Sequence, residues 1–134
     1  ADVIVGFPQE TKEDFQSTYK FIESLPLAFL HVFTYSERPN TIAAKMQGKV
    51  PIAERRERSK ELQNLSTEKK LQFYEKNCGN KGKILWEADN ENGLMFGFSE
   101  NYIRVARNFD EKYINQITEE TLKELDTANQ YYKI

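Results

Sequence analysis

The chain has 134 residues, a formal net charge of −2 and 39% hydrophobic residues, a composition typical of one globular domain or two small ones. No apolar run is long enough to cross a bilayer, and no basic region precedes a signal-like core, so we predict a cytoplasmic protein without membrane contact. The single cysteine, Cys78, and the single histidine, His31, exclude a self-contained zinc or iron–sulfur site made of the usual ligands.

Positive charge is concentrated in the middle of the chain. Residues 45–76 hold nine Lys/Arg and five Asp/Glu, whereas residues 1–44 and 77–134 each carry a net charge of −3. A basic segment can favour a polyanion through counterion release. The alternating charges from Arg55 to Glu61 are more typical of a solvated helix face, which is the interpretation we favour.

The first part of the chain predicts a strand–helix–strand unit. Residues 1–6 form a short β-branched run, and Thr11 with Asp14 has the pattern of a helix N-cap with a capping box. The helix ends before Pro26, and residues 28–35 form a second strand. This order implies parallel pairing. Two parallel strands cannot bury both faces of a sheet, so we expect the unit to be part of a truncated, larger structure.

A long polar helix is predicted over residues 51–76, after an irregular stretch over residues 36–50. Its apolar face is thin, consisting of Leu62, Leu65 and Phe73, and is interrupted by Lys69. We therefore interpret this helix as a connector between two domains rather than a core element.

The last part of the chain predicts a small antiparallel barrel of short strands. Residues 83–87 and 94–98 flank a turn containing Asn92 and Gly93, which indicates a hairpin. Residues 102–106 alternate as a half-buried strand, and residues 131–134 form a closing strand. Residues 114–125 are compatible with a strand pair or with a helix.

Few residues point to chemistry. The turn Gly6-Phe7-Pro8 follows a strand, where parallel sheets bind small molecules, although a plain strand-to-helix turn is the simpler interpretation. Glu10 could contact a ligand amine, but helix capping is favoured. His31 is expected to be a strand or barrel-interior residue rather than a catalytic one. Phe98, Tyr102 and Arg104 offer an aromatic and basic surface for single-stranded nucleic acid. The alternative, that Phe98 and Tyr102 are barrel core, remains open.

Several motifs resemble one enzyme family, the radical-SAM methylthiotransferases. Residues 2–15 (DVIVGFPQETKEDF) resemble a late strand–helix segment of their barrel, and residues 30–44 (LHVFTYSERPNTIAA) resemble the final barrel strand and the loop after it. Residues 58–65 resemble the connecting helix, and residues 97–105 (GFSENYIRV) are similar to the signature of the terminal TRAM barrel. The forms His-Val-Phe and Glu-Asn-Tyr-Ile are most similar to the branch that acts on threonylcarbamoyladenosine in tRNA.

This resemblance implies a three-part architecture. Residues 1–50 would be the C-terminal βαβ portion of a radical-SAM, TIM-like barrel, residues 51–76 a connecting helix, and residues 77–134 the antiparallel TRAM β-barrel. The resemblance further implies methylthio insertion into N6-threonylcarbamoyladenosine. S-adenosylmethionine and two iron–sulfur clusters would be required, with the cluster cysteines in regions outside this chain. The chain alone is therefore expected to be inactive and to ligate no metal.

The resemblance also implies where ligands would lie. The residues expected on the S-adenosylmethionine side are Gly6, Phe7, Pro8 and Glu10. Those expected at the mouth where substrate enters are Phe33, Tyr35 and Arg38. Those expected to face RNA, with the tRNA anticodon stem-loop as partner, are Phe98, Asn101, Tyr102 and Arg104.

Two positions depart from the family pattern. Gln9 stands where the family has glycine, which argues against a backbone that requires glycine there. Asn40 stands where the family has glycine before Thr41, and because asparagine tolerates left-handed conformations, the turn is expected to be kept. The unpaired edges of the first two strands also predict dimerisation or segment swapping. The functional alternative is a stand-alone small barrel that binds RNA or protein without catalysis.

Overall fold

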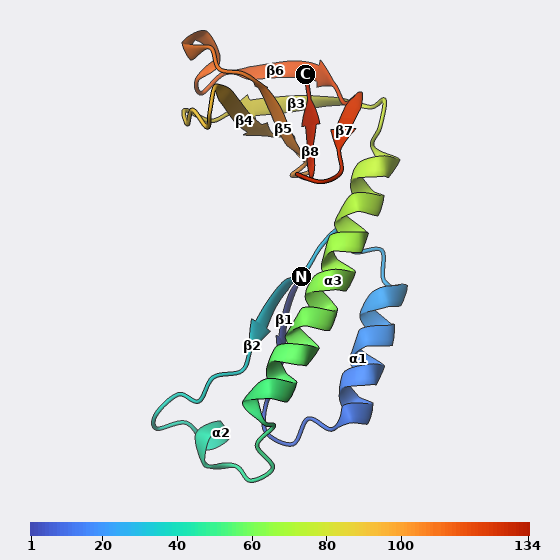
Figure 1. Cartoon of the computed structure of the whole chain (residues 1–134), viewed down its shortest axis with the longest axis vertical. Coiled ribbons are helices and arrows are strands. Elements are labelled where there is room, and N and C mark those ends of the chain that lie inside the picture. Colours follow the sequence, from blue (N-terminus) through green and yellow to red (C-terminus); the bar gives the residue numbers. More distant parts are fainter. The chain divides into compact units, whose positions relative to one another are not determined.

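The computed structural model describes residues 1–134, which divide into two compact units, Ala1–Lys70 and Leu71–Ile134 (Figure 1). The first unit holds β1 (Asp2–Val5), α1 (Lys12–Ser24), β2 (His31–Thr34) and α2 (Ile42–Lys45). The second unit holds β3 (Lys81–Trp86), β4 (Leu94–Phe98), β5 (Arg104–Asn108), η1 (Glu111–Tyr113), β6 (Ile117–Thr121), β7 (Glu124–Asp126) and β8 (Tyr131–Lys133). Helix α3 (Ile52–Lys76) contributes to both units.

The predicted strand–helix–strand unit is confirmed. Strands β1 and β2 pair in parallel, with Asp2 opposite His31 and Val5 opposite Thr34. Strand β2 is shorter than predicted because β1, its only partner, offers four residues for pairing. The capping box of α1 is also confirmed, since Thr11 and Asp14 exchange hydrogen bonds between side chain and backbone.

Helix α3 runs from the first unit into the second, but the interpretation that it is not a core element is wrong. In the first unit, Leu62 and Leu65 are buried in the core that β1, α1 and the segment before β2 supply. Lys69, which interrupts the apolar face, is also buried, and its Nζ donates to the carbonyls of Glu23 and Leu25 at 2.9 and 2.8 Å. These carbonyls belong to the last turn of α1 and the residue after it, where a cation is favourable. Helix α3 is thus a core element that caps its neighbour.

The stretch between β2 and α3 is less irregular than predicted. Residues Ile42–Lys45 form the one-turn helix α2, with Thr41 as its N-cap. The Thr41 hydroxyl accepts a hydrogen bond from the Ala44 amide at 3.2 Å. The capping residue was visible in the sequence, but one turn is too short to produce a helical period.

The second unit is a curled six-stranded sheet in the order β6-β3-β4-β5-β8-β7. Strands β6 and β7 lie at opposite ends of this order, yet only Leu122 and Lys123 separate them. The last residue of β6 and the first residue of β7 are three positions apart, which spans at most about 11 Å, so the two ends of the sheet must approach each other. The expected barrel-like curvature is therefore present. One detail differs: β5 and β8 pair in parallel, because β8 turns back from β7, which runs opposite to β5.

Residues 114–125, for which the sequence allowed a strand pair or a helix, contain strand β6 and the start of strand β7. The strand predicted over residues 102–106 begins two residues later, at Arg104. The cause is a turn in which the Tyr102 amide donates to the Ser99 carbonyl at 2.9 Å. Tyr102 itself has a left-handed φ of 63°, which no extended strand can contain.

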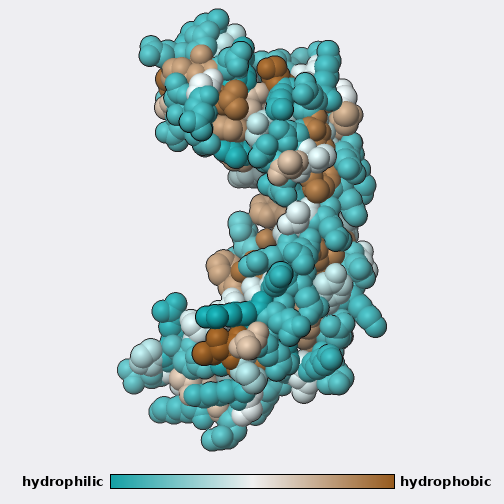
Figure 2. Space-filling model, in the orientation of Figure 1, coloured by the Kyte–Doolittle hydropathy of each residue, from teal (hydrophilic) through white to brown (hydrophobic).

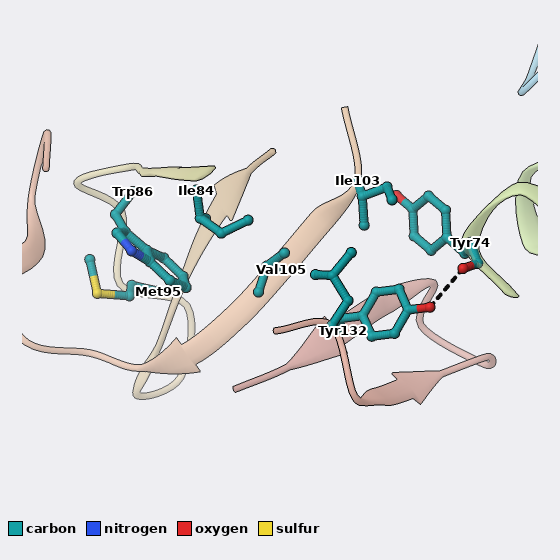
Figure 3. Packing of buried hydrophobic residues seen from close by; sticks show 8 residues of the cluster. Tyr74, Ile84, Trp86, Met95, Ile103, Val105 and Tyr132 are labelled. Atoms are coloured by element: carbon teal, nitrogen blue, oxygen red, sulfur yellow. Dashed lines mark hydrogen bonds between the residues drawn. The ribbon is translucent and has the colours of Figure 1, made fainter. Parts of the chain in front are cut away.

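The core of the second unit fills the inside of this curled sheet (Figure 3). Its fully buried members are Tyr74, Ile84, Trp86, Met95, Ile103, Val105, Leu122 and Tyr132. Tyr74 enters from the last turns of α3, and the Tyr132 hydroxyl donates to its carbonyl oxygen at 2.6 Å. Burial raises the pKa of Tyr132 to about 12, so the phenol stays protonated as a donor.

Gly97 allows close approach of β3 and β4. A Cβ atom at Gly97 would lie 2.5 Å from the Leu85 carbonyl oxygen and 2.7 Å from Ile84 Cγ2. We expect Gly97→Ala to reduce the free energy of unfolding by about 1–3 kcal/mol, measured by denaturant titration. Gly82→Ala is the control, because its nearest contact would be 3.4 Å, and it should change stability by less than about 0.5 kcal/mol. Equal effects would contradict the prediction.

Candidate functional site

The turn after β1 is built from left-handed backbone. Gly6 has a φ of 76° and Gln9 a φ of 71°, and the Gln9 amide donates to the Gly48 carbonyl at 2.8 Å. The inference that Gln9 argues against a glycine-type backbone is therefore wrong: the conformation is kept and the glutamine adopts it. The matching inference for Asn40 is confirmed, since its φ is 66°.

Glu10 is buried beneath this turn and does not cap α1. Its Oε2 accepts a hydrogen bond from the Gly6 amide at 2.6 Å and another from Arg58 Nη1 at 2.5 Å. The carboxylate is thus directed into the protein, whereas the ring of Phe7 is partly exposed. The turn therefore presents an aromatic side chain outward and holds an ion pair inside.

A second buried arginine joins the ends of β2 and the following loop. Arg55 Nε donates to the Val50 carbonyl at 2.7 Å, and Nη1 donates to the Tyr35 carbonyl at 3.1 Å. The guanidinium also binds both carboxylate oxygens of Glu37, at 2.8 and 3.2 Å. Arg55 and Arg58 are only 5% and 4% exposed, so the prediction of a solvated helix face is wrong for these two positions.

The hydrogen bond with Arg55 lowers the pKa of Glu37 from 4.5 to about 2. A carboxyl group whose pKa is lower in the folded state stabilises that state above its unfolded pKa, and this stabilisation is lost as the pH falls through the folded value. We therefore expect the stability difference between the wild type and Glu37→Gln to be constant above about pH 5.5 and to shrink between about pH 4.5 and 2. Denaturant titrations across this range measure it. A difference that does not change with pH would contradict the ion pair.

The residues expected at the substrate mouth lie along or after β2. Phe33 is exposed and pairs with exposed Ile4 across the sheet, on the face opposite the core. Arg38 is exposed in the following loop. The Tyr35 hydroxyl is buried without a hydrogen-bond partner, and its ring lies 5.4 Å from the Arg55 guanidinium carbon. The face of the β1–β2 pair opposite the core thus carries the exposed apolar side chains Ile4 and Phe33.

In the second unit, a row of side chains crosses the outer face of the sheet. Pairing places Leu85 opposite both Ile117 and Phe98, and Phe98 opposite Arg104. Directly opposed residues have Cβ atoms about 5 Å apart, so these four form a continuous row. Leu85, Phe98 and Ile117 line a shallow depression of about 410 Å³ together with Tyr102.

Phe98 in this row and Tyr102 in the depression beside it are both exposed, which excludes the alternative that they form the core. Phe98 is 36% and Tyr102 is 74% exposed. On the face drawn in Figure 2, hydrophobic atoms appear only in small areas within a mostly hydrophilic surface. Because these apolar side chains are contiguous and border a depression, the row is a candidate binding surface.

Arg104 and Asn101 have local partners. The Arg104 guanidinium carbon lies 3.8 Å from the centre of the Phe96 ring, and Nη2 is 3.4 Å from Glu91 Oε1. The Asn101 side chain accepts from Ser99 Oγ at 2.6 Å and donates to Asn77 Oδ1 at 3.3 Å. Asn101 therefore shapes the turn that presents Tyr102, while Arg104 remains partly accessible at the end of the row.

Sequence reasoning missed four residues of these sites, Arg55, Arg58, Leu85 and Ile117. The two arginines continue the spacing of Leu62 and Leu65 on α3, so their helical period was a usable signal. Leu85 and Ile117 gave no such signal, because the outward face of a short strand is set by its pairing.

No group of three or more His, Cys, Asp or Glu side chains is arranged to hold a metal ion. None of the helices combines the length and hydrophobicity needed to cross a membrane.

No protein-family model matches the chain. It is 44% identical over 106 residues to a threonylcarbamoyladenosine tRNA methylthiotransferase of Aquifex aeolicus, covering 79% of this chain and 25% of that protein. The corresponding enzyme of Thermotoga maritima is 34% identical over 103 residues, covering 77% of this chain and 24% of that protein.

A tRNA-2-methylthio-N(6)-dimethylallyladenosine synthase of Jannaschia sp. is 37% identical over 127 residues, covering 94% of this chain and 28% of that protein. The chain thus spans about a quarter of the length of these relatives. Identity at this level over most of the chain confirms the resemblance found in the sequence: the chain is homologous to a segment of the tRNA methylthiotransferases.

Proposed function

We propose that the chain supplies the C-terminal part of a radical-SAM tRNA methylthiotransferase that modifies N6-threonylcarbamoyladenosine. In this proposal, residues 1–50 complete the catalytic barrel, residues 51–76 form the connecting helix and residues 77–134 form an RNA-binding TRAM barrel. Identity to the Jannaschia enzyme over 94% of the chain supports the assignment to a methylthiotransferase, because the match extends beyond the small barrel. The 44% identity to the Aquifex aeolicus enzyme supports the choice of threonylcarbamoyladenosine. A stand-alone binding module would not need the parallel β1–β2 pair.

The cofactor side of the proposal concerns the turn after β1. Gly6, Phe7, Pro8 and Glu10 would face S-adenosylmethionine, the source of the radical in this chemistry. The partly exposed Phe7 fits such a ligand, since it lies at the carboxyl end of a parallel strand. Glu10 would act from behind the turn, because Arg58 and the Gly6 amide already bind its carboxylate. Phe33, Tyr35 and Arg38 would lie toward the modified nucleoside.

The RNA-binding side rests on one observation, the exposed row on the second unit. Phe98 and Tyr102 would stack on unpaired bases of the anticodon stem-loop, with Arg104 beside them and Asn101 supporting the turn. Stacking of one base on an aromatic side chain contributes about 1–3 kcal/mol, which corresponds to about 5- to 150-fold in affinity.

Titration of this chain with a tRNA anticodon stem-loop at low and moderate salt tests the proposal. We expect salt-sensitive binding, micromolar or weaker, that Tyr102→Ala and Phe98→Ala each reduce. Phe21→Ala, which removes an exposed aromatic ring from α1, is the matched control and should bind like the wild type. Absence of binding at low salt would refute RNA binding by this segment. Light scattering on the same samples would detect the proposed dimer or segment swap.

A further inference from the structure

We infer that Arg55 and Arg58 of α3 are positioning residues for the turn between β1 and α1. They would hold the turn in the conformation that presents Phe7 and the Gly6 backbone to the cofactor. The inference rests on the proposed function in one respect, that this turn faces S-adenosylmethionine. The contacts within the turn are independent of that assignment.

Arg58 acts on the turn through Glu10. Its Nη1 binds both the carboxylate and the backbone carbonyl of Glu10, at 2.5 and 3.0 Å. Its Nη2 binds Glu54 Oε1, and its guanidinium carbon lies 5.6 Å from the Phe15 ring centre. These contacts use the planar fork of an arginine in a way that a lysine cannot reproduce. The carboxylate oxygen held by Arg58 then accepts the Gly6 amide, which fixes the first residue of the turn.

Arg55 acts on the same turn by occupying space. A Cβ atom on Gly6 would collide with Cγ of Arg55, so the aliphatic stem of Arg55 lies directly against the Gly6 backbone. The head of Arg55 reaches Tyr35 and Glu37 just beyond β2. One side chain thus contacts the segments that follow both strands of the parallel pair. This end of a parallel sheet is where ligands bind, so both arginines lie behind a ligand-facing edge.

Two charged residues forty-five or more positions downstream thus set the shape of a turn that local sequence leaves undetermined. Both are buried on one face of α3, one turn apart, and each is paired with a carboxylate. Arg56, between them, is exposed. This difference provides a matched control on the same helix turn.

Amide hydrogen exchange of this 134-residue chain, followed by NMR, tests the positioning role. We expect Arg58→Met to speed exchange of the Gly6 amide by at least about tenfold, because the Glu10 carboxylate that accepts this amide is no longer held by Arg58. Arg58→Lys should give an intermediate rate, and Arg56→Met should leave the rate unchanged. If Arg58→Met does not fold, the Gly6 exchange rate of Arg58→Lys tests the positioning role by itself. An unchanged Gly6 rate in folded Arg58→Lys would overturn the positioning role.

The cofactor part is tested in the full-length protein with its clusters, by equilibrium dialysis of S-adenosylmethionine. We expect Arg58→Lys to weaken binding by about 5-fold or more, while Arg56→Met leaves it unchanged. Faster Gly6 exchange with unaltered cofactor affinity would overturn the assignment of this turn to the cofactor. Failure of the wild type to bind S-adenosylmethionine would instead refute the proposed function, leaving the exchange result intact.

Discussion

Replacing Arg58 by methionine is expected to reduce the free energy of unfolding of the first unit by about 3–5 kcal/mol. The substitution leaves the Glu10 carboxylate buried with only the Gly6 amide as partner. An unpaired buried charge is costly because neither water nor a counter-ion replaces the lost partner. Denaturant titration followed by far-UV circular dichroism measures the effect. Arg56→Met, at an exposed position, should stay within about 0.5 kcal/mol.

Glu10→Met should cost less than Arg58→Met, because Arg58 keeps Glu54 and the Glu10 carbonyl as acceptors. The double substitution should cost less than the sum of the two single ones, since it removes both charges from the interior. We expect a coupling energy of about 1–3 kcal/mol from this cycle. If the losses in free energy of unfolding from the two single substitutions add up in the double variant, the ion pair between Glu10 and Arg58 does not stabilise the fold.

Local signals in the sequence predicted most of the elements. Thr11 and Asp14 form a capping box in which all the partners lie within one helical turn, so the start of α1 follows from the sequence alone. The same is true of the hairpin between β3 and β4 and of the parallel β1–β2 pair, which a single strand–helix–strand order implies. These features depend on short-range geometry.

The role of α3 depends on distant partners and was harder to predict. Arg55, Arg56 and Arg58 are the same residue type within four positions of one helix, but Arg55 and Arg58 are buried and Arg56 is exposed. The difference arises because Glu10 and Glu37, distant in sequence, approach only one face of the helix. A stricter use of helical period would have grouped Arg55 and Arg58 with Leu62 and Leu65.

The sequence likewise left open whether Phe98 and Tyr102 are exposed or buried. In β4, Met95 and Gly97 lie on the face that covers the main core, and Phe96 and Phe98 lie on the opposite face, where Phe96 is buried with Ala106 and Tyr131 and Phe98 is exposed. A run of four residues without a polar member gives no alternation from which to choose a face. The close packing of Gly97 against β3 determines the choice, and this contact becomes visible only in the assembled sheet.

Trp86→Ala is expected to have an effect as large as that of Arg58→Met, in the other unit. Trp86 is fully buried, packs beside Met95 and donates its Nε1 hydrogen to Thr118 Oγ1 at 2.8 Å (Figure 3). Removing a buried tryptophan ring costs about 3–5 kcal/mol through lost burial and the cavity left behind. Small domains are stable by only about 5–15 kcal/mol, so the second unit should lose much of its stability.

The neighbouring residue on β3 provides the matched control. Leu85 is half-exposed on the outer row, so Leu85→Ala should change the free energy of unfolding far less than Trp86→Ala. Under the proposed function, Leu85→Ala should nevertheless weaken RNA binding, because it removes one side of the surface on which Phe98 lies. Similar stability losses for the two variants would mean that β3 does not present alternate residues to the core and to solvent. Such a result would remove the basis for a binding surface on this face, because the row exists only if Leu85, Phe98 and Ile117 share the outward side.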